Sequence, residues 1–348
     1  MIIASIVFAA TGAFVLNLLL IPAVMTLSHR FEWYDEKNDR KIHTEDTPRL
    51  GGVGIFLSFL IVVAVVLLTR GGFREPGRYL PLIAGTVIIH FLGLLDDFIN
   101  LVAARKFLLQ VLAAVIVSLG PFRIDAIALP FMEGALELGW AAYPVTIIWI
   151  VSISNAVNLI DGADGLAGGV SAIAALFLGT IAAHSGNLTL ALFSFALVGS
   201  VVGFLVYNFP PARIFMGDSG SLLLGFLLAT LPLVGFTEGA PFPAIPVITL
   251  LFLPIIDTLL AIVRRLSRGQ PVHQADREHI HHRLIDRGFG PRKLLVSIYA
   301  GGALLGLTAL SWFVLPPPFN GIVDFFVWGA VITVTLGLGK KERPKGAV

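Results

Sequence analysis

The sequence has no cysteine and few charged residues. Without cysteine there is no disulfide framework, no thiolate metal site and no cysteine nucleophile. Charged residues make up 13% of the 348 residues and hydrophobic residues 56%, whereas a soluble domain carries about 25% charged residues. So little charge cannot cover a soluble surface, and the composition therefore predicts an integral membrane protein. The net charge of +2 gives no reason to expect nucleic acid as a partner.

The apolar residues form long segments without charge. Residues 1–27 precede the first charged residue, Arg30, and lack the basic start and short apolar core of a cleaved secretory signal. The alternation of β-barrel strands is absent, so helices must satisfy the backbone in lipid. We therefore predict an all-α polytopic fold with a single transmembrane domain over residues 1–348. About eleven spans are expected, in residues 1–27, 52–69, 80–97, 107–120, 143–160, 167–184, 189–207, 220–236, 243–264, 294–314 and 320–338.

The fifth and sixth of these segments are close enough to be a broken or re-entrant pair.

Lys and Arg in the short loops indicate the orientation of the protein in the membrane. With the N-terminus outside, the inner segments hold 20 of the 24 Lys and Arg residues, so the C-terminus is predicted in the cytoplasm. No inverted pair of hydropathy blocks typical of transporters is visible. The unusual polar clusters lie on the inner face, near residues 29–51, 96–106, 159–168, 208–221 and 264–293.

Two adjacent carboxylates, Asp96 and Asp97, end the third predicted span. The helix dipole disfavours anions at a C-terminus, so a divalent metal or a cationic group must compensate them. Lys106 opens the next helix and could return across a tight turn to the same place. A solvated helix end is the alternative for the pair alone.

A ladder of oxygen-bearing side chains ends the fifth predicted span, at Asn155, Asn158, Asp161 and Asp164. Neighbours three positions apart share one helix face, and carboxylate and amide oxygens suit Mg²⁺ or Mn²⁺. Polar contacts between membrane helices normally need only one or two such residues. Four of them, with glycines following, favour a ligand site.

Two further carboxylates lie at later spans. Asp218 stands at the start of the eighth predicted span, where it can bind metal while Ser219 and the free N–H groups of the helix start face an anion. A simple N-cap is the alternative. Asp257 lies inside the ninth predicted span, where a carboxylate is costly and usually functional or paired. Arg264, two turns later, is the candidate partner.

Basic and imidazole side chains complete the inner face. Four residues of the last inner loop can bind phosphate, His279, His281, His282 and Arg283, with a zinc site sharing His279 and His282 as the alternative. Three more precede the second span and would also fit a juxtamembrane basic patch: Lys41, His43 and Arg49. Oxygen ligands for a hard cation beside phosphate-binding groups indicate phosphoryl transfer between a lipid and a water-soluble phosphate compound.

Five ordered motifs resemble those of the polyprenyl-phosphate N-acetylhexosamine-1-phosphate transferases, glycosyltransferase family 4. They are Pro48–Gly52, Gly93–Asp97 with Lys106, Asn155–Gly165, Phe215–Ser221 and His279–His282. The resemblance implies transfer of a sugar-1-phosphate from a UDP-sugar to undecaprenyl phosphate, with release of UMP and a need for Mg²⁺, with Mn²⁺ as a substitute. It also implies a plasma-membrane enzyme whose active site faces the cytoplasm. A homodimer is an open alternative for the assembly.

The motifs and the resemblance together assign roles to residues. The catalytic group is expected to be Asp96, Asp97 and Lys106, and the metal ligands Asn158 and Asp218. Substrate binding is expected from Lys41, His43, Arg49, Asn155, Asp161, Asp164, Ser219, His279, His281, His282 and Arg283. The acceptor carries its own phosphate nucleophile, so direct attack on the β-phosphorus is favoured over a covalent route through an aspartate.

The histidine motif favours one branch of the resembled family. Ile280 interrupts the run, where the muramoyl-pentapeptide branch would show three consecutive histidines, so UDP-GlcNAc is the expected donor. Two alternatives stay open on sequence alone. One is a phospho-MurNAc-pentapeptide transferase, and the other, from a different class, is a nucleotide-sugar or phosphate transporter.

Overall fold

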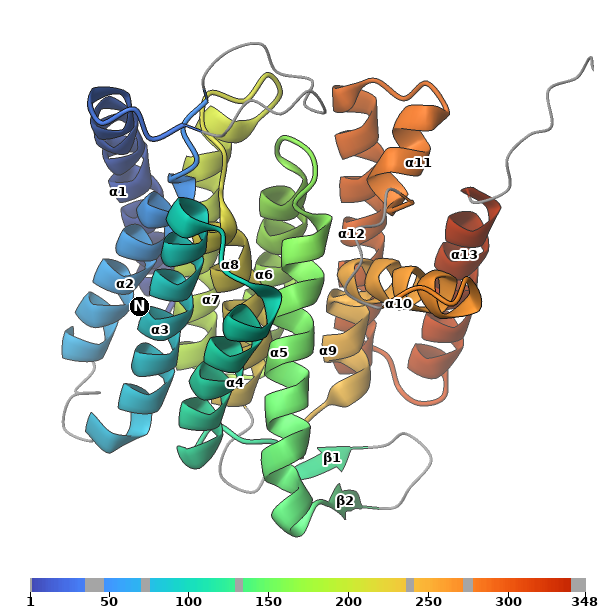
Figure 1. The fold of residues 1–348 in the computed structure, drawn as a ribbon. Helices are drawn as coiled ribbons and strands as arrows, with labels where there is room; N and C mark the ends of the chain where they lie inside the picture. Colours follow the sequence, from blue (N-terminus) through green and yellow to red (C-terminus); the bar gives the residue numbers. More distant parts are fainter. Residues whose placement is uncertain are drawn as a thin grey trace, which may run out of the picture.

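A computed structural model describes residues 2–34, 47–69, 76–128, 134–235, 241–271 and 278–338, and Lys41 and His43 lie outside them. The described chain is all-helical apart from one short hairpin, as predicted (Figure 1). The helices are α1 (Ile2–Arg30), α2 (Gly51–Thr69), α3 (Pro76–Ile99), α4 (Ala103–Leu119), α5 (Ala142–Ile160), α6 (Leu166–His184), α7 (Leu188–Asn208), α8 (Asp218–Gly235), α9 (Ala244–Leu250), α10 (Phe252–Ser267), α11 (Ile280–Asp286), α12 (Pro291–Val314) and α13 (Phe319–Leu338). The hairpin pairs β1 (Ala126–Ala128) with β2 (Ala135–Glu137) in antiparallel fashion.

Nine helices in the described part of the chain are long and apolar enough to cross a membrane. The predicted pair at the fifth and sixth spans is not broken, because α5 and α6 are separate helices of 19 residues each. The break lies instead in the predicted span 243–264, where α9 and α10 meet at 81°. Pro254 contributes to it, since proline has no N–H to bond to the carbonyl of Leu250 and its ring would clash there. The predicted total of eleven spans stays a prediction.

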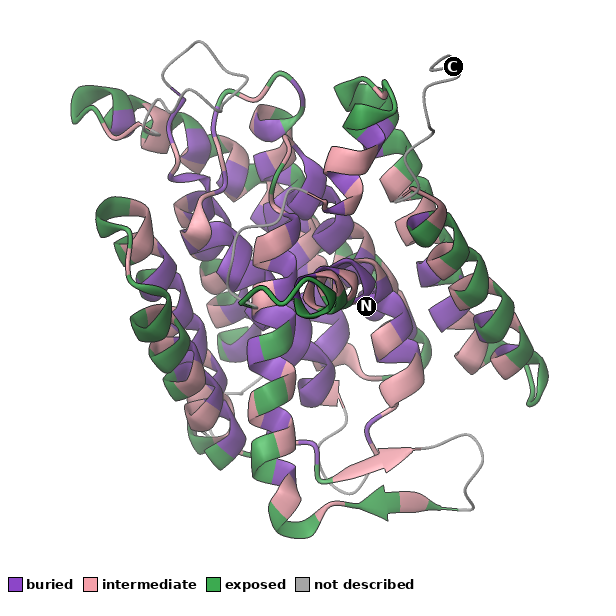
Figure 2. Cartoon of the chain, turned by 45° about the vertical axis from the view of Figure 1, so that its right-hand side comes forward, coloured by how far each residue is buried: buried purple, intermediate pink, exposed green. Residues whose placement is uncertain are grey.

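Helix α8 forms the centre of the bundle. Residues 219–234 are all buried, and α2, α3, α5, α6 and α7 pack around the helix. Figure 2 shows the buried residues gathered inside the bundle. Small residues allow this close approach. A Cβ added to Gly225 would lie 2.6 Å from the Cα of Ser154 on α5 and 2.8 Å from the carbonyl oxygen of Ile153. Close backbone packing therefore fixes α8 against its neighbours.

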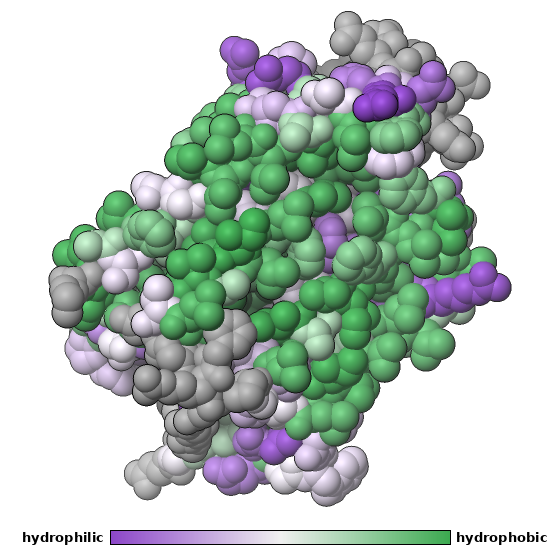
Figure 3. All heavy atoms as spheres, turned by 90° about the vertical axis from the view of Figure 1, so that its left-hand side faces the viewer, coloured by the Kyte–Doolittle hydropathy of each residue, from purple (hydrophilic) through white to green (hydrophobic). Residues whose placement is uncertain are grey.

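The outer surface is apolar where lipid would surround it. Figure 3 shows a broad hydrophobic belt with hydrophilic residues gathered above and below it. Peripheral helix α13 exposes large apolar side chains, including Phe325 and Phe326. This pattern is what a bilayer-embedded helical protein requires, since lipid replaces water around the belt.

The alternating helix directions bring five connections to one end of the bundle. Residues 47–50, 100–102, 161–165, 209–217 and 278–279 lie toward that end, and the β1–β2 hairpin lies at the other (Figure 1). The polar motifs of the sequence therefore come together in space.

Replacing Gly225 with alanine should lower the free energy of unfolding by about 1–3 kcal/mol, because the methyl group would overpack the contact with α5. Thermal unfolding of the detergent-solubilised protein measures the change. The matched control is Gly301→Ala on α12, where an added Cβ has no atom within 4 Å. Equal unfolding temperatures for the two variants would contradict the close packing of α8 on α5.

Candidate active site

Asp96 at the end of α3 joins the start of α4 through a tight turn. Its Oδ1 accepts a hydrogen bond of 2.7 Å from the backbone N–H of Leu101. Its Oδ2 accepts one of 2.9 Å from Nζ of Lys106 on α4. The predicted return of the lysine across the turn is confirmed.

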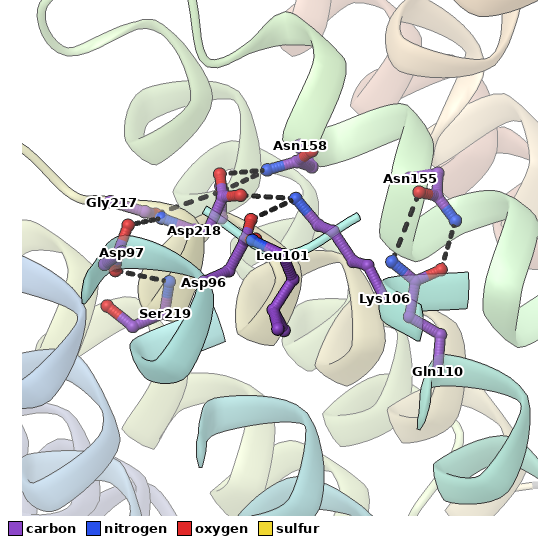
Figure 4. Close-up of polar contacts among 11 residues, drawn as sticks. Asp96, Asp97, Leu101, Lys106, Gln110, Asn155, Asn158, Gly217, Asp218 and Ser219 are labelled. Carbon is purple, nitrogen blue, oxygen red and sulfur yellow. Dashed lines mark hydrogen bonds and ion pairs between the residues drawn. The ribbon is translucent and has the colours of Figure 1, made fainter. Parts of the chain in front are cut away.

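Lys106 also binds Asp218, the first residue of α8, so one ammonium lies between two carboxylates from different helices (Figure 4). Asn158 on α5 donates from Nδ2 to Oδ1 of Asp218 and to Oγ of Ser221, at 2.8 Å each. Both bonds use the amide nitrogen, so Oδ1 is the Asn158 atom that would ligate a cation. Four helices thus converge on one charged cluster, made of Asp96, Lys106, Asn158 and Asp218.

Asp97 has a different environment from Asp96. Its two carboxylate oxygens accept backbone N–H bonds from Asp218 at 2.7 Å and Ser219 at 3.0 Å. A carboxylate from α3 therefore caps the N-terminus of α8, where the helix dipole favours a negative charge. The prediction that these N–H groups are free for an anion was wrong. The side chain of Ser219 is completely buried, so it is not presented to a ligand either.

The turn before α8 is tied to the segment before α2. Phe215 N donates to Pro48 O at 2.7 Å, and Gly51 N donates to Phe215 O at 2.9 Å. Gly217 has a φ of +70°, and an added Cβ would overlap the carbonyl oxygen of Arg49 and the Asp97 carboxylate. Only glycine fits this position, and the fit places Arg49 beside the turn.

The loop between α5 and α6 adds two acidic groups. Asp164 Oδ2 accepts a 3.0 Å bond from Ala212 N and so holds the loop before α8. Burial and, after it, the charges of Asp218, Asp97 and Asp164 together raise the pKa of Asp161 to about 7. The three neighbouring carboxylates therefore disfavour the charged form of Asp161, and a nearby cation would favour it.

Asp218 and Asn158 offer oxygen donors that could hold Mg²⁺. Among the described residues, no three His, Cys, Asp or Glu side chains are arranged to enclose a metal. Mg²⁺ usually takes one or two protein carboxylates and completes its octahedron with water and substrate phosphates. Asp218 with the amide oxygen of Asn158 meets that requirement, with Asp161 and Asp96 close by.

Asn155 lies one turn deeper on α5 and pairs with α4. Its Nδ2 donates to Oε1 of Gln110 at 2.6 Å, and Gln110 Nε2 returns a bond of 3.3 Å (Figure 4). Asn155 was predicted to bind substrate, and the structure gives it this interhelical partner. Gln110 was missed. Its signal was a polar residue one turn after Lys106 in an apolar helix, where such residues are usually functional or paired.

The histidine motif is anchored inside the protein. Asp257 does not pair with Arg264 as predicted; its Oδ2 bonds His279 Nδ1 at 2.8 Å and its Oδ1 accepts the N–H of Ile280 at 2.9 Å. Arg264 lies instead 3.7 Å from Glu278. The sequence separation of 22 residues, from the middle of α10 to the start of α11, hid the Asp257–His279 pair.

His281 connects this motif to the acidic loop. Its ring lies against Gly162, where an added Cβ would overlap the imidazole, so it packs beside the residue that follows Asp161. Burial lowers the pKa of His281 to about 4, with a further contribution from His282. The ring of His282 lies 4.1 Å from that of His281, centroid to centroid. Neutral imidazole is therefore the form of His281 at pH 7.

Arg283 lies apart from the charged cluster. Its guanidinium donates to Glu278 and to the carbonyl oxygen of Thr335 near the end of α13, each at 3.3 Å. The structure therefore does not bring this predicted substrate-binding residue to the aspartates.

Comparisons with known proteins agree with these motifs. Residues 79–236 match glycosyl transferase family 4. A probable undecaprenyl-phosphate N-acetylglucosaminyl 1-phosphate transferase of Bacillus subtilis is 39% identical over 303 residues, covering 86% of this chain and 83% of the relative. A decaprenyl-phosphate N-acetylglucosaminephosphotransferase of Mycobacterium leprae is 34% identical, covering 89% and 83%.

This chain is also similar to a relative whose name gives a different sugar. The phospho-N-acetylmuramoyl-pentapeptide-transferase of Bacillus subtilis is 31% identical over 324 residues, covering 86% of this chain and 97% of the relative. All three relatives match along most of their length, and the family match includes the ends of α3, α5 and α8 that form the cluster. The chain therefore belongs to glycosyl transferase family 4.

Proposed function

We propose that this protein transfers GlcNAc-1-phosphate from UDP-GlcNAc to undecaprenyl phosphate and releases UMP, with Mg²⁺ as cofactor. The reaction takes place at the cytoplasmic face of the plasma membrane. The observation that carries the proposal is the Lys106 ammonium held between Asp96 and Asp218 at a junction of helix ends, with Asn158 beside it. The end of the bundle that holds it receives the water-soluble donor from one side and the lipid acceptor from the bilayer.

The acceptor phosphate attacks the β-phosphorus of the donor. A bond forms between an acceptor oxygen and that phosphorus, and the bond from the β-phosphorus to the bridging oxygen breaks, so UMP leaves with the electron pair. Lys106 binds the acceptor phosphate while Asp96 holds the ammonium in place. Asp97 is a positioning residue, because its two oxygens are used to cap α8. This engagement also makes Asp97 a poor nucleophile for a covalent route.

Asp218 and Asn158 would hold Mg²⁺. When bound, the metal supplies charge neutralisation for the diphosphate and for the departing UMP. Asp161 contributes a further carboxylate, and His281 provides a neutral imidazole beside its loop. Phosphoryl transfer depends mainly on such positioning and charge compensation.

Two observations support GlcNAc as the sugar. The N-acetylglucosaminyl relative from Bacillus subtilis is 39% identical, and the muramoyl-pentapeptide relative of the same organism is 31% identical. Ile280 also interrupts the histidine run. Both favour UDP-GlcNAc as donor.

The reaction is tested with purified protein, undecaprenyl phosphate, Mg²⁺ and an equimolar mixture of UDP-GlcNAc and UDP-MurNAc-pentapeptide. Mass spectrometry of the butanol-extractable lipids should show undecaprenyl-diphosphate-GlcNAc, and added UMP should reverse its formation. A muramoyl product would reassign the donor. Uptake of the nucleotide sugar into vesicles without any lipid product would instead indicate a transporter.

Asp218→Asn and Lys106→Gln should each lower kcat by about a thousandfold or more, because each removes charge stabilisation from the reacting phosphates. Steady-state assays measure the loss, and gel filtration in detergent verifies that the variants are folded. Asp125→Asn is the matched control, since Asp125 is exposed at the hairpin end and pairs with Arg123. Near-normal turnover in either site variant would remove the cluster from the mechanism.

A further inference from the structure

Two aspartates are buried in the membrane-spanning part of the described chain and take no part in the proposed reaction. Asp257 on α10 is 2% exposed, and Asp324 on α13 is 5% exposed. A carboxylate in such a place is costly and is retained with a partner. Asp324 bonds Thr249 Oγ1 and Trp312 Nε1, so its partners belong to the packing of α9, α12 and α13. Asp257 differs because its partners belong to the histidine motif.

The two oxygens of Asp257 hold both the side chain and the backbone of that motif. Oδ2 bonds Nδ1 of His279, whose own side chain is buried. A carboxylate is an acceptor, so Nδ1 of His279 carries the proton and Nε2 is the nitrogen left for other groups.

The second contact orders the helix that carries the other histidines. Ile280 is the first residue of α11, and its N–H is bonded by Oδ1 of Asp257. The preceding residue, His279, makes no side-chain cap of its own. Asp257 therefore supplies the cap from another helix. His281 follows within the same turn and packs on Gly162, beside the acidic loop.

These contacts form a path from α10 to the loop between α5 and α6. α10 turns away from α9 by 81°, and this turn lets a residue of the broken span face the start of α11 (Figure 1). The path then runs from Asp257 through His279 and the first turn of α11 to His281, and from there to Gly162 and Asp161.

We propose that Asp257 is a positioning residue for the sugar-nucleotide site: it fixes the Nδ1-protonated ring of His279 and the first turn of α11 so that the histidine motif meets the donor diphosphate. The inference rests on the proposed function for the identity of the donor. It assigns to Asp257 no contact with either substrate.

Asp257→Asn tests the proposal with an isosteric change. Asparagine keeps an oxygen for Ile280 N but presents an NH₂ group to His279, which forces the ring into the opposite tautomer. The KM for UDP-GlcNAc should rise and kcat/KM for it should fall by about 10- to 100-fold, as for the loss of other supporting partners. The KM for undecaprenyl phosphate should stay unchanged. A general loss of folded protein would instead lower kcat alike with either substrate varied.

Asp324→Asn is the matched control, because it makes the same substitution at an equally buried aspartate without contact to the motif. Its kinetic constants should equal those of the wild type. An equal loss in Asp324→Asn, or an unchanged donor KM in Asp257→Asn, would overturn the proposal.

Variants of His279 extend the test, and the first of them does not require Asp257→Asn to fold. His279→Asn retains a donor at the position of Nδ1 and should keep wild-type thermal stability while raising the donor KM. In a double-mutant cycle, Asp257→Asn added to His279→Gln should cost no more than twofold further in kcat/KM, since both act through one ring. Losses in kcat/KM that multiply in the double variant would contradict the positioning role of Asp257. An unchanged KM for UDP-GlcNAc in His279→Asn would contradict it as well.

A readout independent of activity separates this inference from the proposed function. The chain has eight histidines, so ¹⁵N-histidine NMR in detergent can assign the His279 resonances by their loss in His279→Gln. A protonated Nδ1 in the wild type that is lost in Asp257→Asn supports the dyad even where no lipid product forms. A His279 ring protonated only at Nε2 in the wild type would refute the dyad, whatever the enzyme makes.

Discussion

The contact between the Lys106 ammonium and the carboxylates of Asp96 and Asp218 is the interaction on which the rest of the site depends. Like charges at the ends of apolar helices repel strongly, because little water screens them. One cation from α4 allows α3 and α8 to present their carboxylates at the same place. In the proposed reaction a divalent cation that arrives with the substrate phosphates would further offset the carboxylate of Asp218.

Two helices, α8 and α11, are capped in the same way, by an aspartate from another helix. Asp97 on α3 caps the first turn of α8, and Asp257 on α10 caps the first turn of α11. In each case an aspartate of one helix satisfies the N–H groups of another and complements its dipole. The local sequence then need not supply the cap, so the side chains of Asp218 and His279, which stand at these helix starts, make other contacts.

Much of this arrangement could be predicted from the sequence, and the exceptions have physical causes. Charge and hydropathy predicted the polytopic helical fold, and the i, i+3 ladder with the paired aspartates predicted where the cluster would form. The break near Pro254 was missed, since the hydropathy of residues 243–264 is continuous. The partner of Asp257 was missed because contacts within a helix are visible as spacing, whereas contacts between helices depend on their directions. For the same reason Ser219 was expected to face a ligand, although α3 covers it.

A structure of the protein with UDP-GlcNAc and Mn²⁺ tests the central claim most directly, because the anomalous signal of manganese locates the metal. The account predicts the metal on a carboxylate oxygen of Asp218, at the distance of about 2.1–2.2 Å expected for a hard cation on oxygen, with the diphosphate between it and the His279–His282 segment. It also predicts that the Lys106 ammonium turns from Asp218 toward a phosphate. Metal and diphosphate bound elsewhere, with the bonds from Lys106 to Asp96 and Asp218 unchanged, would contradict the account.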